Sequence, residues 1–402
     1  MVALLFFVSC LNYIDRQVLA IVIPLMRQQL GITPAQYGTS VSAFLLAYGL
    51  MYAGSGLILD RTNGRVGLAV FVAFWSFFSS LHAAITGVAG LIIFRFLLGL
   101  AEPGGWTGAV KCIGDWFDPV QRGMVSGIFT AGSTVASLLT PPLAVFITLH
   151  YGWRFAFLLS GVLGLFWVPL WWQATRSGKI TSQPPSGTRV PMWIAIRSPQ
   201  AAGYALARFF GDSSGYFFMF WVVDYLVAAK GFSFVMIGSV GWIPFMCNAL
   251  GAVAGGYASS WLARAGHAPL WSRKIAMTVA PVFVLAGLLA VPSTSTSFVI
   301  AVLGISAFGV GVWAGNLHAL AVDTFSQATL GGLYGLAGAA GAVGGFVFNA
   351  LVAHLRMQNR DTEIFIALST LQPLAVSCLW LLLREPLKTA HYDEKAVFNS
   401  PK

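Results

Sequence analysis

The chain has 402 residues, of which 57% are hydrophobic and only 9% are charged, and its mean hydropathy is +0.77. A soluble globular domain carries about 25% charged residues, so the composition excludes an ordinary soluble protein. The continuous apolar runs also exclude an outer-membrane barrel, whose strands alternate. The net charge of +10 does not indicate nucleic-acid binding, because Lys and Arg are spread through short loops. We therefore predict an all-α polytopic membrane protein.

Hydrophobicity and turn residues predict twelve transmembrane helices. They span 3–26, 36–59, 66–87, 89–113, 121–148, 153–173, 200–229, 233–262, 272–291, 297–320, 327–355 and 361–383. The longest polar interruption separates the sixth helix from the seventh. The predicted division is an N-terminal six-helix bundle at 1–173, a cytoplasmic linker at 174–199, a C-terminal six-helix bundle at 200–384 and a cytoplasmic tail at 385–402.

The positions of Lys and Arg predict the orientation. With both termini in the cytoplasm, fifteen of these residues fall on the cytoplasmic side and five on the outer side. This excess is what the positive-inside rule expects. The prediction is a multi-pass protein of the cytoplasmic (inner) membrane with both termini cytoplasmic.

Charged residues inside two predicted helices are the main functional signal. Asp15 and Arg16 lie within the first helix, and Arg95 and Glu102 lie within the fourth. A charge at the centre of a membrane helix costs ~2.5–3.5 kcal/mol on insertion scales, so such residues should face a polar cavity or a partner. Neighbours such as Asp15 and Arg16 diverge by ~100° around a helix. Arg95 and Glu102 are seven residues apart and share a helix face.

These four residues have the chemistry of an anion carrier. Arginine offers a planar fork to a carboxylate, so Arg16 and Arg95 are predicted to bind substrate. We expect Arg16 to make the main contact, because Glu102 on the same face should take up part of the charge of Arg95. Asp15 and Glu102 are the predicted proton-coupling groups. The alternative is that both pairs are static salt bridges that fix helix packing.

The two halves of the chain are weakly similar to each other. A shift of 208 residues places Gly114-Asp115-Trp116-Phe117 on Val322-Asp323-Thr324-Phe325. The same shift places Arg95 on Leu303 and Glu102 on Val310. The similarity predicts two pseudo-symmetric bundles with the site between them, and charged groups only in the first half.

The loop after the second helix carries a family motif. Gly56-Leu57-Ile58-Leu59-Asp60-Arg61-Thr62-Asn63-Gly64-Arg65 resembles the G-x-x-x-D-R-x-G-R signature of the major facilitator superfamily, with one extra residue before Gly64. The resemblance implies two six-helix bundles that expose a central site alternately to each side. Asp60, Arg61 and Arg65 are then predicted to form a conformational latch at the cytoplasmic ends of the helices.

Further motifs resemble the anion:cation symporter family, near the hexuronate and aldonate transporters. They are Asn12-Tyr13-Ile14-Asp15-Arg16, Arg95-Phe96-Leu97-Leu98-Gly99-Leu100-Ala101-Glu102, Tyr151-Gly152-Trp153-Arg154 and Trp313-Ala314-Gly315-Asn316-Leu317. The resemblance implies a proton-coupled symporter for organic anions, often sugar acids. Tyr13, Tyr48, Trp313 and Asn316 are further predicted substrate contacts. One departure is Trp221-Val222-Val223-Asp224-Tyr225, where sugar-acid relatives usually have Pro and Lys.

We expect a monomeric secondary transporter that imports an organic anion with a proton, and not an enzyme. A facilitator or exporter of another small organic acid or a neutral solute is the first alternative. A membrane receptor or embedded enzyme is a more remote one. No cofactor, metal or nucleic acid is expected, since neither the four cysteines nor the histidines have ligand spacing.

Overall fold

The computed structural model describes residues 1–62, 64–117, 119–176, 196–325 and 327–383, and within these ranges every regular element is a helix. The first half contains α1 (Val2–Leu30), α2 (Pro34–Arg61), α3 (Gly64–Leu81), η1 (His82–Ala84), α4 (Val88–Ala101), α5 (Pro103–Trp116), α6 (Pro119–Tyr151) and α7 (Trp153–Ala174). The second half contains α9 (Pro199–Phe220), α10 (Val222–Ala228), α11 (Phe234–Val240), α12 (Ile243–Arg264), α13 (Pro269–Thr278), α14 (Ala280–Val284), η2 (Leu285–Ala290), α15 (Thr296–Thr324), α16 (Gln327–Met357) and α17 (Asp361–Leu382).

Each of the twelve predicted spans corresponds to one helix or to consecutive helical pieces. In the described residues, ten stretches are long and apolar enough to cross a membrane. The other two predicted spans are α2 and α9–α10, which are helical but carry more polar residues along their length. The polytopic all-helical prediction is confirmed. The predicted tail, 385–402, and most of the predicted linker, 174–199, lie outside the described residues.

Several spans are interrupted where proline enters. The fourth span breaks into α4 and α5 because Pro103 has no N–H to continue the backbone ladder, which leaves Glu102 at the junction. In the ninth span α13 ends just before Ala280-Pro281. The break at Glu102 places a carboxyl group at an irregular point of the helix, where side chains of neighbouring helices can reach it.

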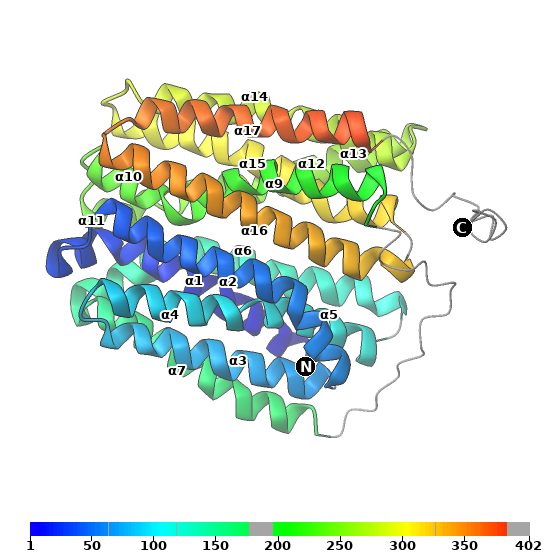
Figure 1. The fold of residues 1–402 in the computed structure, drawn as a ribbon, viewed down its shortest axis with the longest axis horizontal. Coiled ribbons are helices and arrows are strands. Elements are labelled where there is room, and N and C mark those ends of the chain that lie inside the picture. The colour runs from blue at the N-terminus through cyan, green and yellow to red at the C-terminus, as the bar shows by residue number, and fades with distance from the viewer. Residues whose placement is uncertain (63, 118, 177–195, 326, 384–402) are drawn as a thin grey trace, which may run out of the picture.

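The two halves pack side by side as two groups of helices (Figure 1). In that view α1, α3, α4 and α7 occupy the lower part of the molecule, and α12 to α17 occupy the upper part. The halves meet through α2 against α16, α1 against α9 and α10, and α6 against α11. The connections at 31–33, 229–233 and 358–360 gather at one end of the bundle, which we call the distal end.

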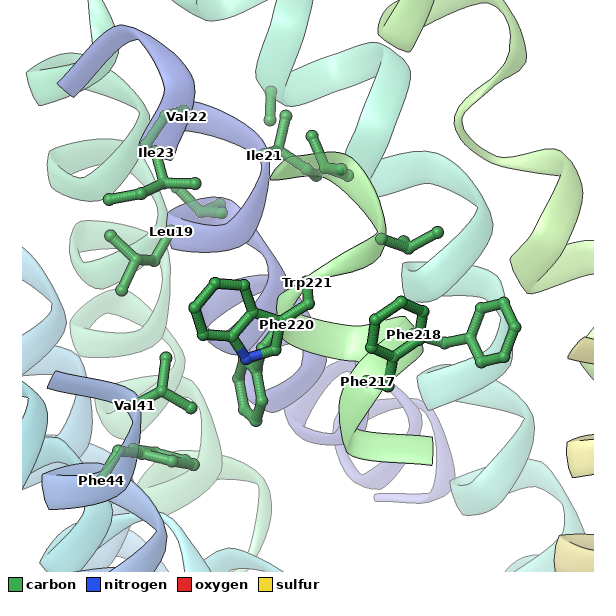
Figure 2. Close-up of a cluster of buried hydrophobic side chains, with 14 of the residues drawn as sticks. Leu19, Ile21, Val22, Ile23, Val41, Phe44, Phe217, Phe218, Phe220 and Trp221 are labelled. Carbon is green, nitrogen blue, oxygen red and sulfur yellow. The ribbon is translucent and has the colours of Figure 1, made fainter. Parts of the chain in front are cut away.

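Apolar side chains fill the interface between the halves toward the distal end. Figure 2 shows residues of α1 and α2 facing the end of α9, all of them buried: Leu19, Ile21, Val22, Ile23, Val41, Phe44, Phe217, Phe218, Phe220 and Trp221. Within a bilayer such contacts are stabilised by close packing, because lipid tails are as apolar as the side chains. This part of the interface is therefore filled by packed apolar side chains.

Candidate functional site

Arg16 and Glu102 form an ion pair between the first and fourth spans. Arg16 Nε donates to Glu102 Oε2, and the glutamate is fully buried. The guanidinium of Arg16 also lies 4.5 Å from the ring centre of Tyr48 and 5.7 Å from that of Tyr13. Two of the predicted substrate contacts, Tyr13 and Tyr48, therefore lie beside a third, Arg16, which is paired with the proton-coupling candidate Glu102. Since Arg16 Nη2 has no hydrogen-bond partner in the described chain, part of its fork remains available.

Arg95 is the least satisfied buried charge of this region. Its side chain is fully buried on α4, and none of its three guanidinium nitrogens has a hydrogen-bond partner among the described residues. Its nearest aromatic neighbours are Phe44, at 4.3 Å from the ring centre, and Phe220, at 5.7 Å. A buried guanidinium without an anion is costly, so this position favours binding of an anionic group.

The pairing of these charges differs from the expectation drawn from spacing. Glu102 was expected to occupy Arg95 and leave Arg16 free, but the structure pairs Glu102 with Arg16 and leaves Arg95 without an ion pair. The physical reason is distance, because seven residues of helix rise about 10.5 Å. Arg16 on the neighbouring helix approaches Glu102 directly. The expected commitment of Arg95 to Glu102 is therefore wrong.

The side chain of Asp15 points into the interior of the first half, away from the side chain of Arg16. Ser79 Oγ of α3 donates to Asp15 Oδ1 at 2.6 Å, and the same hydroxyl lies 3.2 Å from Ser160 Oγ of α7. Asp15 Oδ2 has no hydrogen-bond partner in the described part of the chain. The two neighbours thus contact different helices, as their ~100° divergence predicts. The carboxyl group of Asp15 is therefore held by α3, away from the ion pair of Arg16 and Glu102.

Tyr13 and Tyr48 belong to an aromatic layer around Arg16. The ring of Tyr13 packs edge-on against Trp106, with centres 6.2 Å apart. Tyr48 stacks on Phe44 at 5.6 Å, so it connects the surroundings of Arg16 with those of Arg95. The structure brings these predicted residues together in one place.

Trp313 and Asn316 contact different neighbours, although both lie on α15. The indole of Trp313 packs against Gly211 of α9, where an added Cβ would come within 2.3 Å of the ring. Asn316 lies against Gly255 of α12, and its Nδ2 donates to Val312 O of its own helix at 3.0 Å. Trp313 therefore faces the helix that adjoins the first half, whereas Asn316 packs inside the second half.

The predicted latch is described only in part. Arg61 is exposed, and the side chain of Asp60 lies outside the part that the structure describes. Arg65 Nη2 donates to Trp172 O at 2.9 Å, and its guanidinium covers the Trp172 ring at 4.5 Å. The loop is thus anchored to the end of α7. The latch formed by Asp60, Arg61 and Arg65 stays a prediction.

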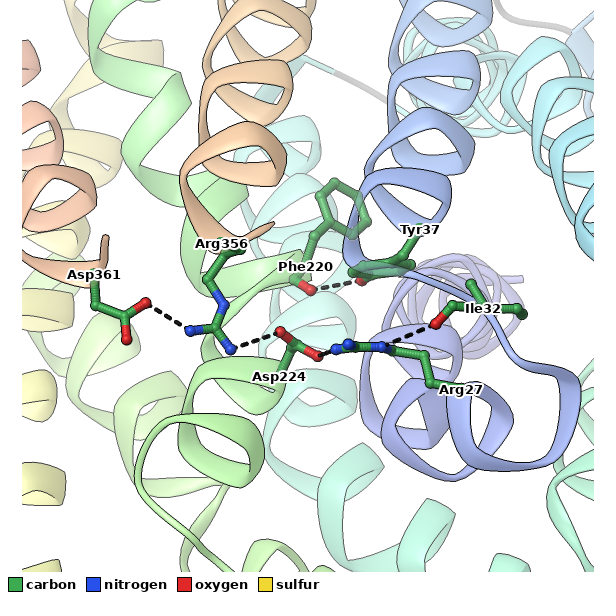
Figure 3. A network of polar contacts seen from close by, with 7 residues as sticks. All are labelled: Arg27, Ile32, Tyr37, Phe220, Asp224, Arg356 and Asp361. Atoms are coloured by element: carbon green, nitrogen blue, oxygen red, sulfur yellow. Dashed lines mark hydrogen bonds and ion pairs between the residues drawn. The ribbon is translucent and has the colours of Figure 1, made fainter. Parts of the chain in front are cut away.

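Two groups of charges were not among the predicted site residues. The first is the pair Arg208–Asp212 on α9. The second is a network at the distal end (Figure 3), in which Arg27 Nη1 lies 2.5 Å from Asp224 Oδ1 and Arg356 Nη2 lies 3.3 Å from Asp224 Oδ2. Arg356 Nη1 also contacts Asp361 Oδ1 at 2.6 Å. Spacing along the chain cannot reveal these contacts, because Asp224 lies 197 positions from Arg27 and 132 positions from Arg356.

Hydrogen bonds extend this link between the halves. Tyr37 of α2 donates to Phe220 O at 2.6 Å (Figure 3). Asn349 of α16 accepts from Trp221 Nε1 at 2.7 Å and donates to Ser42 Oγ at 2.6 Å. Within the described ranges, no group of three or more His, Cys, Asp or Glu residues could hold a metal ion. The site is built from arginines, carboxyl groups and aromatic rings.

An all-helical membrane fold in two halves, with ionisable residues buried between its helices, defines a class of membrane transporter. The chain matches the family model of the Major Facilitator Superfamily over residues 5–349, and it belongs to that superfamily.

Its relatives include sugar-acid transporters. It is 29% identical over 356 residues to the probable L-galactonate transporter of Escherichia coli K12, covering 83% of this chain and 78% of the relative. It is 25% identical to the hexuronate transporter of the same strain, covering 96% and 93%. It is 27% identical to the probable galactarate/D-glucarate transporter of Bacillus subtilis 168, covering 83% and 80%.

A solved structure has the same fold. The crystal structure of a bacterial homologue of the human lysosomal transporter Spinster, in an inward-facing and unoccupied conformation, matches with a TM-score of 0.72 at 18% identity. The match covers 95% of this chain and 94% of that one. The expected superfamily and its fold are therefore confirmed.

Proposed function

We propose that the chain imports a sugar acid, such as a hexuronate or an aldonate, by proton symport through alternating access. The observation that carries this proposal is Arg95, a fully buried guanidinium with no hydrogen-bond partner among the described residues. A carboxylate is the group that its planar fork fits best. The similarity to galactonate and hexuronate transporters supports the sugar-acid class.

Coupling to the proton follows from the ion pair of Arg16 and Glu102. While Glu102 is charged, it holds Arg16. Protonation of Glu102 removes that charge, so Arg16 can turn its fork to the substrate carboxylate beside Arg95. Asp15, bonded to Ser79 away from this pair, is the second group that can carry a proton. When the anion and the proton are both bound, fewer buried charges lack a partner than when only one of them is bound. This favours movement of the two across the membrane together.

Alternating access requires that each end can close, and the distal network is suited to close one of them. Arg27 of the first half and Arg356 of the second both contact Asp224. We propose that the distal end faces the outside, as the Lys and Arg distribution favours, and that the network holds it closed. The loop with Asp60, Arg61 and Arg65 would then serve the opposite end. A single chain contains both halves, so we propose that it acts as a monomer in the inner membrane.

Transport by purified protein in liposomes tests the proposed function. We expect L-galactonate or D-galacturonate to accumulate when the inside is made alkaline relative to the outside, and to equilibrate without accumulation when the gradient is removed. Uptake that equilibrates in both conditions would support the facilitator alternative. Failure of every sugar acid to enter would contradict the proposed substrate class.

Replacing Asp224 by asparagine is expected to open the distal end. Asp224 is 1% exposed and contacts two arginines, so its loss leaves Arg27 and Arg356 with one carboxylate fewer between the halves. Spin labels at the exposed positions 28 and 358, in a variant without native cysteines, should show a longer and broader distance distribution. Glu363→Gln, which removes a charge from an exposed pair with Arg360, is the matched control. Unchanged distances in the Asp224 variant would contradict the gating role.

Gly38→Ala is expected to have a similar effect through packing alone. A Cβ at Gly38 would lie 2.3 Å from Ala353 Cβ of α16, which is shorter than two carbon atoms can approach. The helices must separate, so the spin-label distance at the distal end should lengthen and transport should slow. The control is Gly54→Ala on the same helix, where an added Cβ would meet only Met51 Sδ, at 3.7 Å. Equal behaviour of the two variants would show that closure does not depend on this contact.

A further inference from the structure

A second ion pair lies inside the second half, on the helix that adjoins the first half. Arg208 Nε and Nη2 each lie 2.8 Å from Asp212 Oδ2, and the two side chains are 11% and 14% exposed. The Arg208 guanidinium covers the ring of Tyr334 of α16 at 5.2 Å. An added Cβ at Gly341, on the same helix, would come within 2.4 Å of Asp212 Oδ2. The pair is therefore enclosed by α9 and α16 rather than placed on the lipid-facing surface.

The pair retains hydrogen-bonding capacity. Arg208 Nη1 is buried and has no hydrogen-bond partner in the described ranges. The indole nitrogen of Trp313, a residue only 1% exposed, is also buried without a partner there, and it lies against Gly211, the residue next to Asp212. Close packing against Gly211 holds the indole in this position. Two unused donors and a carboxylate thus lie along one turn of α9, where a hydroxyl group could bridge them.

Tyrosines of α2 connect this pair with the site around Arg16. The Arg16 guanidinium lies 4.5 Å from the Tyr48 ring, and the Tyr48 and Tyr52 rings are 5.6 Å apart. Tyr52 packs against Gly338 of α16, where an added Cβ would lie 2.7 Å from the Tyr52 ring. Gly338 lies one helical turn from Tyr334 on the same helix. The two pairs are thus linked through side chains of α2 and α16.

We propose that Arg208, Asp212 and Trp313 form a net-neutral subsite for the hydroxyl groups of the substrate, and that the chain therefore selects singly charged polyhydroxy acids over diacids. The inference rests on the proposed function and names its substrate class. Arg208 stays paired with Asp212, whereas Arg95 has no carboxylate partner in the described chain, and Arg16, once Glu102 is protonated, turns to the same substrate carboxylate as Arg95. One substrate carboxylate satisfies both Arg95 and Arg16. A second carboxylate would meet Asp212, and like-charge contacts in a buried site are strongly unfavourable.

Calorimetry on the purified full-length chain tests the selection. The ligands are L-galactonate, with one carboxylate and hydroxyls, galactarate, with two carboxylates, and hexanoate, with one carboxylate and no hydroxyls. We expect galactonate to bind at least ~10-fold more tightly than either of the others. Galactarate binding as tightly as galactonate would overturn the inference and leave the proposed function standing. If neither sugar acid binds, the proposed function itself fails.

Variants separate a hydroxyl subsite from a structural pair. Trp313→Phe removes only the indole donor, and the double variant Arg208→Gln with Asp212→Asn removes both charges together. Each should reduce the preference for galactonate over hexanoate by ~10-fold, while hexanoate affinity stays the same. A purely structural role would weaken both ligands equally, and that result would overturn the inference. The control is Arg360→Gln with Glu363→Gln, which removes an exposed pair at the distal end and should leave the preference unchanged.

Discussion

Replacing Arg95 by glutamine is expected to lower the affinity for a sugar acid by ~30-fold or more. The substrate carboxylate would lose its partner in a fully buried position, and truncating one member of a buried charge pair costs about 2–5 kcal/mol. Every 1.4 kcal/mol is a factor of ten in affinity, so even the lower limit is readily measured. Lysine at position 95 keeps the charge but loses the planar fork, and should recover only part of the affinity.

Variants of Arg16 show which of the two arginines contributes more to substrate affinity. Its guanidinium is held by Glu102 before substrate arrives, so Arg16→Ala both removes a contact and leaves Glu102 without its ion-pair partner. We expect Arg16→Ala to nearly abolish binding and Arg16→Lys to weaken it. Calorimetry with purified protein measures all four variants. Arg360→Gln controls for the loss of one positive charge, because Arg360 is 51% exposed in its side chain. Undiminished binding in both the Arg95→Gln and Arg16→Ala variants would place the anion site elsewhere.

The helices could be predicted from the sequence because each span repeats the same physical signal. Apolar runs of ~20 residues bounded by Gly, Pro and charges suffice to place a membrane helix to within a few residues. Thr33 and Pro34, for example, start α2 with a capping box in which Thr33 and Gln36 satisfy each other's backbone groups. Breaks inside a span, such as the junction at Glu102 and Pro103, also have a local cause in proline.

The pairing of charges could not be predicted in the same way. Arg16 and Glu102 are 86 positions apart, and only the packing of the first and fourth spans brings them together. Spacing within one helix suggested Glu102 as a partner for Arg95, because helical periodicity reports a shared face but not which neighbouring helix lies closest. Asp15 shows where local geometry does suffice, since its direction away from Arg16 follows from the helix alone.

Asp224 illustrates a residue whose partners cannot be found from spacing along the chain. Two arginines, Arg27 and Arg356, lie on either side of it. A lysine at the same place would repel both of them. The carboxylate at position 224 therefore joins the two halves at the distal end through charges that lie far apart in the sequence.

Replacing Glu102 by glutamine, or Asp15 by asparagine, is expected to abolish proton-driven accumulation. In Glu102→Gln, Arg16 always lacks its ion-pair partner. Substrate should therefore still bind, but its binding should no longer require protonation of residue 102. In Asp15→Asn, the amide can still accept the hydrogen bond from Ser79, so the fold should be kept while the titrating group is lost. Exchange of substrate across the membrane does not require proton release, and it should survive in at least one of the two variants.

Uptake into liposomes under an imposed pH difference, measured beside counterflow without one, distinguishes these effects. For one proton per substrate, a difference of one pH unit corresponds to ~1.4 kcal/mol and supports about tenfold accumulation. We expect that factor in the wild type and in Glu363→Gln, whose carboxyl lies in an exposed pair. In Glu102→Gln and Asp15→Asn the internal concentration should only equal the external one. Wild-type accumulation in both variants would contradict the assignment, because neither buried carboxyl of the first half would then be needed to couple the proton to the anion.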